Sequence, residues 1–361
     1  MEVSFSRLQM MFLLLLSLGI SNHVLIIPHL LKAAGRDAWI SILFAYLILT
    51  GWSFILYLIL KSMHTLSFNT WLSGRLGNVG FWIIGGAIAI YLLSAGMLII
   101  YDTTKNVSIY FLPRTSNIIV ILSFIFISYS AARSGLKTIM YMSSLLLPIV
   151  WLLGIGVAVS TRGSKDYGML FPILTEGINP GLQGGVIVFG GSIDLLVLLF
   201  LQHKLSKPLN YGSVFVLLTL LVGLIIGPTM GSIAAFGPSQ AANMRFPAFE
   251  QWRLVMIGRH ISHVDFLAAF QLMAGSIVRT SLMIYLIYDL IGSRFPKYRQ
   301  TVMLCSVAIM SIPSIFMISD IWMQEMIHNY YYTYSFYFGV LLTAALFAIT
   351  YFPQRKERKL L

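Results

Sequence analysis

The first apolar stretch, Leu8 to Leu31, contains no Lys, Arg, Asp or Glu, and yet polar residues interrupt its centre. A helix of this length, at about 1.5 Å per residue, crosses a hydrocarbon core of about 30 Å. Its middle reads Gly19-Ile20-Ser21-Asn22-His23, and glycine, serine and asparagine all weaken a helix. The stretch is therefore predicted to form two half-helices around a polar break. A plain spanning helix whose small residues serve packing is the alternative.

A second apolar stretch, Gly184 to Leu201, has a similar interruption. Gly190-Gly191-Ser192 lies at its centre, and Asp194 follows two residues later. Two glycine-interrupted spans at matching places in two halves of a chain indicate the inverted repeat of a transporter. The substrate site would then lie between the two breaks, near the midplane of the bilayer.

Composition supports a membrane protein, because only 10% of the residues are charged and 58% are hydrophobic. We predict an all-α integral membrane fold of about ten transmembrane helices, arranged as a broken-helix, five-plus-five inverted repeat. Residues 1–361 would form one transmembrane domain, with repeats at about 8–159 and 184–352. The predicted spans are residues 8–32, 39–60, 81–102, 117–132, 137–159, 184–202, 212–232, 266–291, 301–319 and 334–352.

The net charge of +12 does not indicate a nucleic-acid partner, because the basic residues are scattered over short loops and the C-terminal tail. Their distribution favours a cytoplasmic position for both termini. The tail from Arg355 to Lys359 would also bind the anionic lipid surface of the membrane. The lone Cys305 excludes an internal disulfide.

Two aromatic-rich stretches are expected outside the hydrocarbon core. In the outer loop 233–265, a short amphipathic helix is predicted over the vestibule, with Glu250 and Arg253 on its polar face. Its apolar face would consist of Phe249, Trp252, Met256 and Ile257. The run Asn329 to Tyr337 (NYYYTYSFY) is expected to form an aromatic belt at the membrane interface.

Ionisable residues inside spans are costly, so each is a candidate functional residue. Asp194 lies mid-span in the sixth segment and Arg279 near the middle of the eighth. They could form a structural ion pair, or Asp194 could hold a ligand ammonium or a coupling proton. The nearby glycine break favours the second interpretation. Asp102 and Lys105, at the end of the third span, are expected to be interfacial.

Broken spans offer free N–H groups for a carboxylate and free carbonyls for an ammonium, which together suit a zwitterionic amino acid. Polar residues of the third and eighth spans could complete the pocket. The predicted ligand-binding residues are Gly19, Ile20, Ser21, Tyr91, Gly190, Gly191, Ser192, Asp194, Ser281 and Tyr285.

The sequence contains no Walker loop, HExxH or GxSxG motif, so no enzyme is predicted and no cofactor is expected. His260 and His263 lack further ligands nearby, so no metal site is expected either.

Residues 245–271 resemble the signature that follows the seventh span in B subunits of Bacillus-type spore germinant receptors. The matching residues are Phe246, Pro247, Glu250, Arg253, Ile257, Gly258, Ile261 and Asp265. This chain departs from that pattern at Arg259, His260 and His263.

The resemblance implies a fold similar to amino acid permeases, partnership with an A subunit and a lipoprotein C subunit in the spore inner membrane, and sensing of a small nutrient, often an amino acid. Three functions remain open from the sequence. The chain could be a ligand-sensing receptor subunit, an amino acid or cation symporter, or a scaffold with a vestigial pocket.

Overall fold

The computed structural model describes residues 4–256, 264–292 and 295–354, apart from the side chain of Ser21. In this part of the chain every regular element is a helix, and the one extended pairing is an isolated parallel bridge between Phe5 and Leu205. Eight helical stretches are long and apolar enough to cross a membrane. The first, Arg7–Met63, contains two crossings, and the 17-residue α13 (Arg299–Ile315) adds one more. The predicted all-α integral membrane fold with about ten spanning helices is confirmed.

The first half of the chain begins with an interrupted span. Helix α1 (Arg7–Ile20) is joined to α2 (Ile26–Ala34) by a π-helical turn at Ser21–Leu25. The helices that follow are α3 (Ala38–Met63), α4 (Phe68–Tyr110), α5 (Asn117–Ser134) and α6 (Leu136–Ser160). Helix α4 bends at Gly77, whose φ of 72° is a conformation that other residues rarely adopt.

The second half also begins with an interrupted span. Helix α7 (Asn179–Ser192) is followed by a 3₁₀ segment at Ile193–Val197 and then by α8 (Leu198–Leu201). The remaining spans are α9 (Tyr211–Phe236), α12 (Phe266–Ile291), α13, and α14 (Asp320–Met326) continued through a π-helical turn at Ile327–Tyr331 into α15 (Tyr332–Ile349). Both halves thus have the order expected for repeats at 8–159 and 184–352, whose inverted symmetry stays a prediction.

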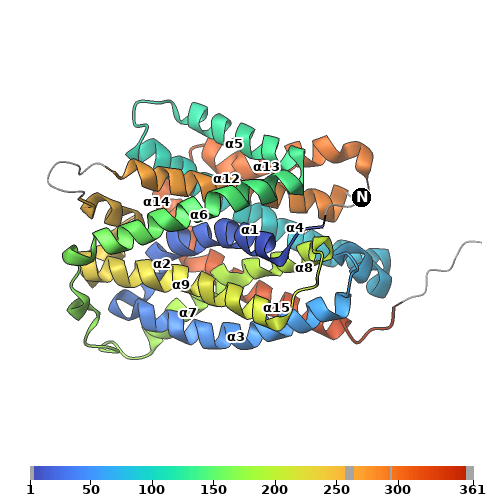
Figure 1. Ribbon diagram of the computed structural model, residues 1–361, viewed down its shortest axis with the longest axis horizontal. Coiled ribbons are helices and arrows are strands. Elements are labelled where there is room, and N and C mark those ends of the chain that lie inside the picture. The colour runs from blue at the N-terminus through green and yellow to red at the C-terminus, as the bar shows by residue number, and fades with distance from the viewer. Residues whose placement is uncertain (1–3, 257–263, 293–294, 355–361) are drawn as a thin grey trace, which may run out of the picture.

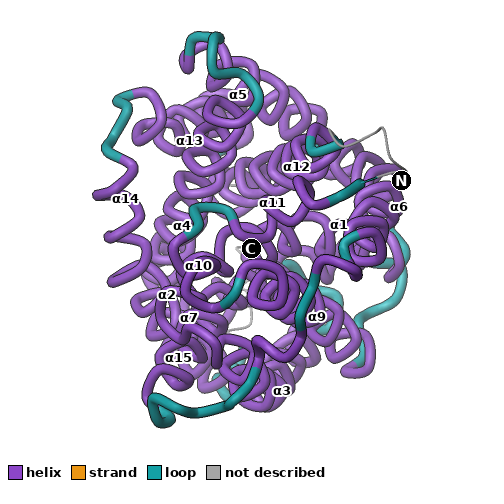
Figure 2. Tube along the Cα trace, turned by 90° about the vertical axis from the view of Figure 1, so that its left-hand side faces the viewer, coloured by secondary structure: helices purple, strands orange, loops and turns teal. Residues whose placement is uncertain are grey.

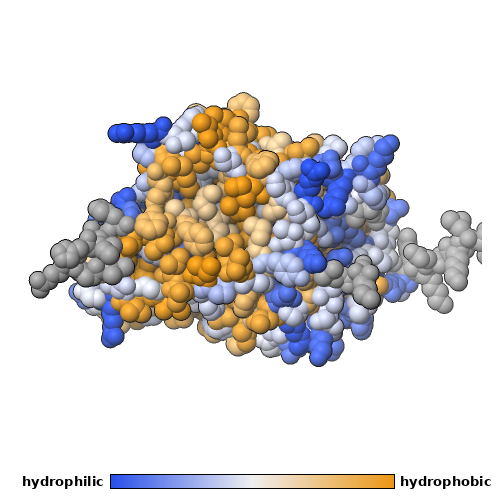
Figure 3. All heavy atoms as spheres, turned by 45° about the horizontal axis from the view of Figure 1, so that its top comes forward, coloured by the Kyte–Doolittle hydropathy of each residue, from blue (hydrophilic) through white to orange (hydrophobic). Residues whose placement is uncertain are grey.

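The interrupted helices lie inside the bundle. Helix α7 packs on α2, α3 and α15, α4 packs on α12 and α13, and α1 packs on α6, α9 and α12. Figure 2 views this arrangement along the helices, with α5 and α13 on the side opposite α3 and α15. Helix α1 begins and α15 ends at the same end of the molecule (Figure 1). An apolar belt crosses the surface, and hydrophilic side chains gather towards the two ends (Figure 3), as a bilayer requires.

The outer loop forms the predicted short amphipathic helix over residues 247–254. It contains α10 (Pro238–Asn243), α11 (Pro247–Glu250) and a 3₁₀ turn at Gln251–Leu254, and a proline starts each short helix. The predicted pair between Glu250 and Arg253 is present, with an N–O distance of 3.1 Å. Phe249 and Trp252 are buried, whereas Met256 is 65% exposed and Ile257 lies outside the described residues.

The aromatic run 329–337 does not lie at the end of a span. The last span begins at Asp320 rather than near residue 334, which places the run in its interior. Successive helical side chains point about 100° apart, so the run cannot face one surface. Tyr332 is only 2% exposed, while Tyr330 and Tyr334 point outward. The predicted interfacial belt is therefore wrong.

Candidate functional site

The first break is a π-helical turn, which confirms the predicted interruption of the first span. His23 lies in this turn, and its Nδ1 is 2.9 Å from the carbonyl oxygen of Gly19. The side chain thereby bonds to the backbone of the turn that precedes it. Asn22 is 2% exposed, so the break is enclosed by protein.

The second break lies later than predicted. Helix α7 continues to Ser192, whose hydroxyl donates to the carbonyl of Val188 at 2.8 Å, and the 3₁₀ segment starts at Ile193. The Ser192 hydroxyl therefore bonds to the backbone of its own helix.

Gly190 and Gly191 allow neighbouring helices to approach α7 closely. A Cβ atom on Gly190 would lie 2.1 Å from the carbonyl oxygen of Tyr332 in α15. A Cβ atom on Gly191 would lie 2.2 Å from the Cδ1 atom of Ile26 in α2. These glycines lie within a regular helix, so close packing rather than backbone freedom explains them.

The two predicted intramembrane charges form an ion pair. Arg279 Nη2 in α12 is 2.5 Å from Asp194 Oδ2, and each side chain is only 4% exposed. The Tyr91 hydroxyl of α4 donates to Asp194 Oδ1 at 2.8 Å, and Arg279 Nη1 donates to the Ser17 carbonyl of α1 at 3.3 Å. We call Ser17, Tyr91, Asp194 and Arg279 the core cluster. It neutralises both charges and links both interrupted spans to α4 and α12.

Two predicted site residues on α12 lie outside this cluster. The Ser281 hydroxyl is 3.0 Å from the Ser128 carbonyl of α5 and 2.6 Å from the Ile277 carbonyl of its own helix. It therefore holds α12 against α5. Tyr285, one turn later, is half-buried and packs against the apolar core. That any of the ten predicted residues binds a ligand stays a prediction.

Two cavities of very different volume lie near these residues. Beside Tyr91 and Asp194 there is a cavity of only about 10 Å³, room for about one water molecule. A cavity of about 540 Å³ lies on another side of α1, and Gly19 and Ile20 line it. Its other walls are α6, α9 and α12, together with residues of the loop after α6, of α11 and of the 3₁₀ turn that follows α11. We call it the side cavity, and its volume is typical of small-molecule sites.

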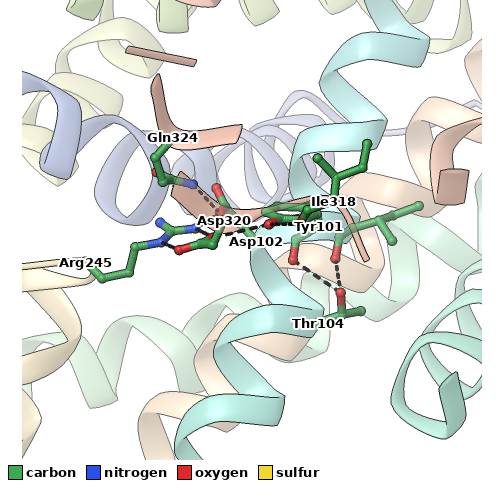
Figure 4. Close-up of polar contacts among 8 residues, drawn as sticks. Tyr101, Asp102, Thr104, Arg245, Ile318, Asp320 and Gln324 are labelled. Carbon is green, nitrogen blue, oxygen red and sulfur yellow. Dashed lines mark hydrogen bonds and ion pairs between the residues drawn. The ribbon is translucent and has the colours of Figure 1, made fainter. Parts of the chain in front are cut away.

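A third feature, the outer cluster, joins a loop to two spans (Figure 4). Arg245, which precedes α11, forms ion pairs with Asp102 of α4 and with Asp320 of α14, the latter at 3.2 Å. Tyr101 donates from its hydroxyl to the carbonyl of Ile318 at 3.0 Å. Burial alone would lower the pKa of Arg245, but the carboxylates of Asp102 and Asp320 raise it by more. The net pKa therefore lies above the usual value, and the guanidinium stays charged.

The outer cluster was missed in the sequence. Asp102 is 3% exposed, α4 continues for eight residues beyond it, and its predicted interfacial depth stays a prediction. The available signal was a carboxylate in an apolar span together with Arg245 at the head of the 245–271 motif. Their pairing could not be inferred from spacing alone.

Comparison with known proteins gives consistent matches. The family model described as spore germination protein matches residues 5–325. Spore germination protein XB of Bacillus anthracis is 35% identical over 312 residues, which are 86% of this chain and 88% of that relative. Spore germination protein KB of Bacillus subtilis (strain 168) is 23% identical over 295 residues, 79% of this chain and 77% of the relative. The putative spore germination protein YfkT of the same organism is 27% identical over 244 residues, 66% and 64% of the two chains.

Proposed function

This chain belongs to the spore germination protein family, and we propose that it is the membrane subunit of a germinant receptor. In this proposal it binds a small nutrient such as an amino acid and triggers germination. It would reside in the spore inner membrane and act with an A-type subunit and a lipoprotein C-type subunit. The described chain has little surface outside its spans, so a signal has to pass to partners.

The core cluster is the observation that carries this proposal. It links the end of α1 and the segment after α7 to α4 and α12 through three side chains and one backbone carbonyl. Buried charges are rare in membrane spans and are usually retained for function. A ligand that moves either break changes the geometry of the same ion pair, which suits a switch between two states.

The core cluster also favours a receptor over a symporter. A coupling cation needs an available carboxylate, whereas Arg279 already neutralises Asp194 and both carboxylate oxygens have partners. A working symporter is therefore the second candidate, and an uptake measurement separates the two.

The test is an in-frame deletion of the gene, with germination followed as loss of optical density against single nutrients. We expect the deletion strain to lose its response to at least one nutrient, and the cloned gene to restore it. We also expect the amount of this chain to fall when the A-type or C-type subunit is deleted. Unchanged germination with reduced nutrient uptake would instead identify a transporter.

A further inference from the structure

The side cavity lies between α6 and α9, two helices whose small residues would suit direct packing against each other. Gly154 and Ala158 of α6 line it from one side, and Gly223 and Gly227 of α9 line it from another. In membrane bundles, small residues spaced four apart usually pack against a neighbouring helix. Here a Cβ atom on Gly223 or Gly227 would meet no atom within 4 Å. Helix α1 lies in the gap between α6 and α9 (Figure 1).

Two buried carboxamides border the side cavity with an unused oxygen each. Gln271, 7% exposed, donates from Nε2 to the Val150 carbonyl at 2.7 Å. Gln251, 4% exposed, donates from Nε2 to the Pro228 carbonyl and to the Ser232 hydroxyl. These bonds fix the orientation of each amide, and neither Oε1 accepts a hydrogen bond from the described residues. Both oxygens therefore suit donors on a bound molecule.

A cation lies beside one of these oxygens. A Cβ atom on Gly231 would lie 3.2 Å from Lys165 Nζ and 2.5 Å from Gln251 Oε1, so both groups approach the same point. Lys165 is half-buried and forms no ion pair with the described residues. Burial lowers the pKa of its ammonium. A half-buried cation without a carboxylate partner suits an anionic group of a ligand.

A further acceptor comes from the π-helical turn. His23 lines the side cavity, and its Nδ1 faces the Gly19 carbonyl. This contact assigns the ring proton to Nδ1 and leaves Nε2 as an acceptor. Apart from Tyr167 and Thr219, the remaining walls are apolar, with leucine, tryptophan and glycine residues from the four helices.

We propose that the side cavity is the nutrient site, and that it takes a small ligand with one carboxylate, an N–H donor and an apolar body, as in an apolar α-amino acid. This inference rests on the proposed function. Lys165 binds the carboxylate, the oxygens of Gln251 and Gln271 accept from the ammonium, and the apolar side chain lies between α6 and α9. The cavity borders Gly19 and Ile20, less than one turn beyond the Ser17 carbonyl that accepts from Arg279, so an occupied cavity contacts the same part of α1 as the core cluster.

The test fills the cavity from a position where an added Cβ atom meets no neighbour within 4 Å. Gly223→Leu places a side chain in the side cavity, whereas Gly156→Leu is a matched control on α6 that lies outside the lining and also meets no atom within 4 Å. Spores carrying each variant are given L-alanine, L-valine, L-leucine or L-phenylalanine singly, and the amount of protein is measured by immunoblot. We expect Gly223→Leu to raise the half-maximal concentration by about tenfold or more at normal abundance. Gly156→Leu should leave it unchanged.

The role of Lys165 is tested with the same amino acids and their carboxamides. Lys165→Gln should raise the half-maximal concentration of the amino acids by about tenfold and should change that of the carboxamides by less than about twofold. Equal effects on acids and amides would overturn the assignment of the carboxylate to Lys165.

Other results separate failure of the site from failure of the function. If the deletion abolishes a response that Gly223→Leu leaves intact, the side cavity is not the nutrient site. A response limited to nutrients without a carboxylate, such as inosine or glucose, would overturn the ligand class. If the deletion strain germinates normally with every nutrient, the proposed function itself fails, and this inference fails with it. Should Gly223→Leu not accumulate, Gly227→Leu repeats the test, because its Cβ also meets no atom within 4 Å.

Discussion

Removing the charge of Asp194 should strongly destabilise the protein. In the folded state the Arg279 side chain is 4% exposed, and besides Asp194 it has one further partner, the Ser17 carbonyl at 3.3 Å. Asp194→Asn therefore leaves a buried guanidinium without a counter-charge, which costs about 3–5 kcal/mol. Arg279→Gln leaves a buried carboxylate whose one remaining partner among the described residues is the Tyr91 hydroxyl, and we expect a loss of similar size.

The double variant should recover part of this loss. Asp194→Asn combined with Arg279→Gln removes both charges, and the remaining cost is that of imperfect hydrogen bonds, about 1–3 kcal/mol. The coupling energy of the double-mutant cycle should therefore be about 2 kcal/mol or more. The pair Glu250 and Arg253 is the control, because Arg253 is 48% exposed and such pairs couple by about 0.2–1 kcal/mol.

The measurement is the free energy of unfolding of each variant, purified and reconstituted in lipid bicelles. Destabilisation by each single variant together with a large coupling energy supports a structural ion pair. Effects that add within about 0.5 kcal/mol would refute this reasoning, because groups in direct contact should couple. Normal stability of Asp194→Asn with a weakened nutrient response would instead assign Asp194 to the ligand.

Three further predictions follow from close contacts and charge. Gly190→Ala should lower the denaturation temperature, because its Cβ would lie 2.1 Å from a backbone oxygen of α15. Gly185→Ala, whose Cβ would have its nearest contact at 3.7 Å, should leave the denaturation temperature unchanged. Equal effects of the two variants would contradict the packing argument. Arg245→Gln should speed protease cleavage between α9 and α12 in proteoliposomes, while an unchanged rate would show that the outer cluster does not hold this loop. Burial lowers the pKa of Lys165 below the usual 10.5, so its affinity for a carboxylate is full below that lowered pKa and falls as pH rises through it. The half-maximal amino acid concentration should therefore rise with alkaline pH in the native protein and not in Lys165→Arg, and a parallel rise in both would count against this role.

The number and type of elements were predictable because the hydrocarbon core excludes charge and unsatisfied backbone. The same reasoning placed the first break, where glycine, serine, asparagine and histidine interrupt one span. The sequence reasoning misplaced the second break, because a pair of glycines is found both where the backbone opens and where two helices pack closely. Which of these applies depends on Tyr332, a residue far away in the sequence.

The sites were harder to predict because each depends on the packing of distant segments. Asp194 and Arg279 were recognised as costly charges, but their distance follows from how α12 lies beside the 3₁₀ segment that follows α7. Asp102 meets Arg245 only after the outer loop folds back over the bundle. The side cavity exists because α6 and α9 stand apart, and no residue pattern in either helix encodes that separation.

The backbone bridge at Phe5 and Leu205 determines where the protein can bend. Phe5 donates its N–H to the Lys204 carbonyl and accepts from the Ser206 N–H, each at 2.9 Å, so the start of α1 is fixed to the segment after α8. Both interrupted spans therefore share one pivot at the end of the molecule where the N-terminus lies. Helix α1 has 14 residues, about 21 Å, so a tilt of about 10° around that pivot displaces its far end by about 4 Å. That far end is the π-helical turn, where the side cavity and the core cluster meet α1, so a small rotation produces its largest displacement there.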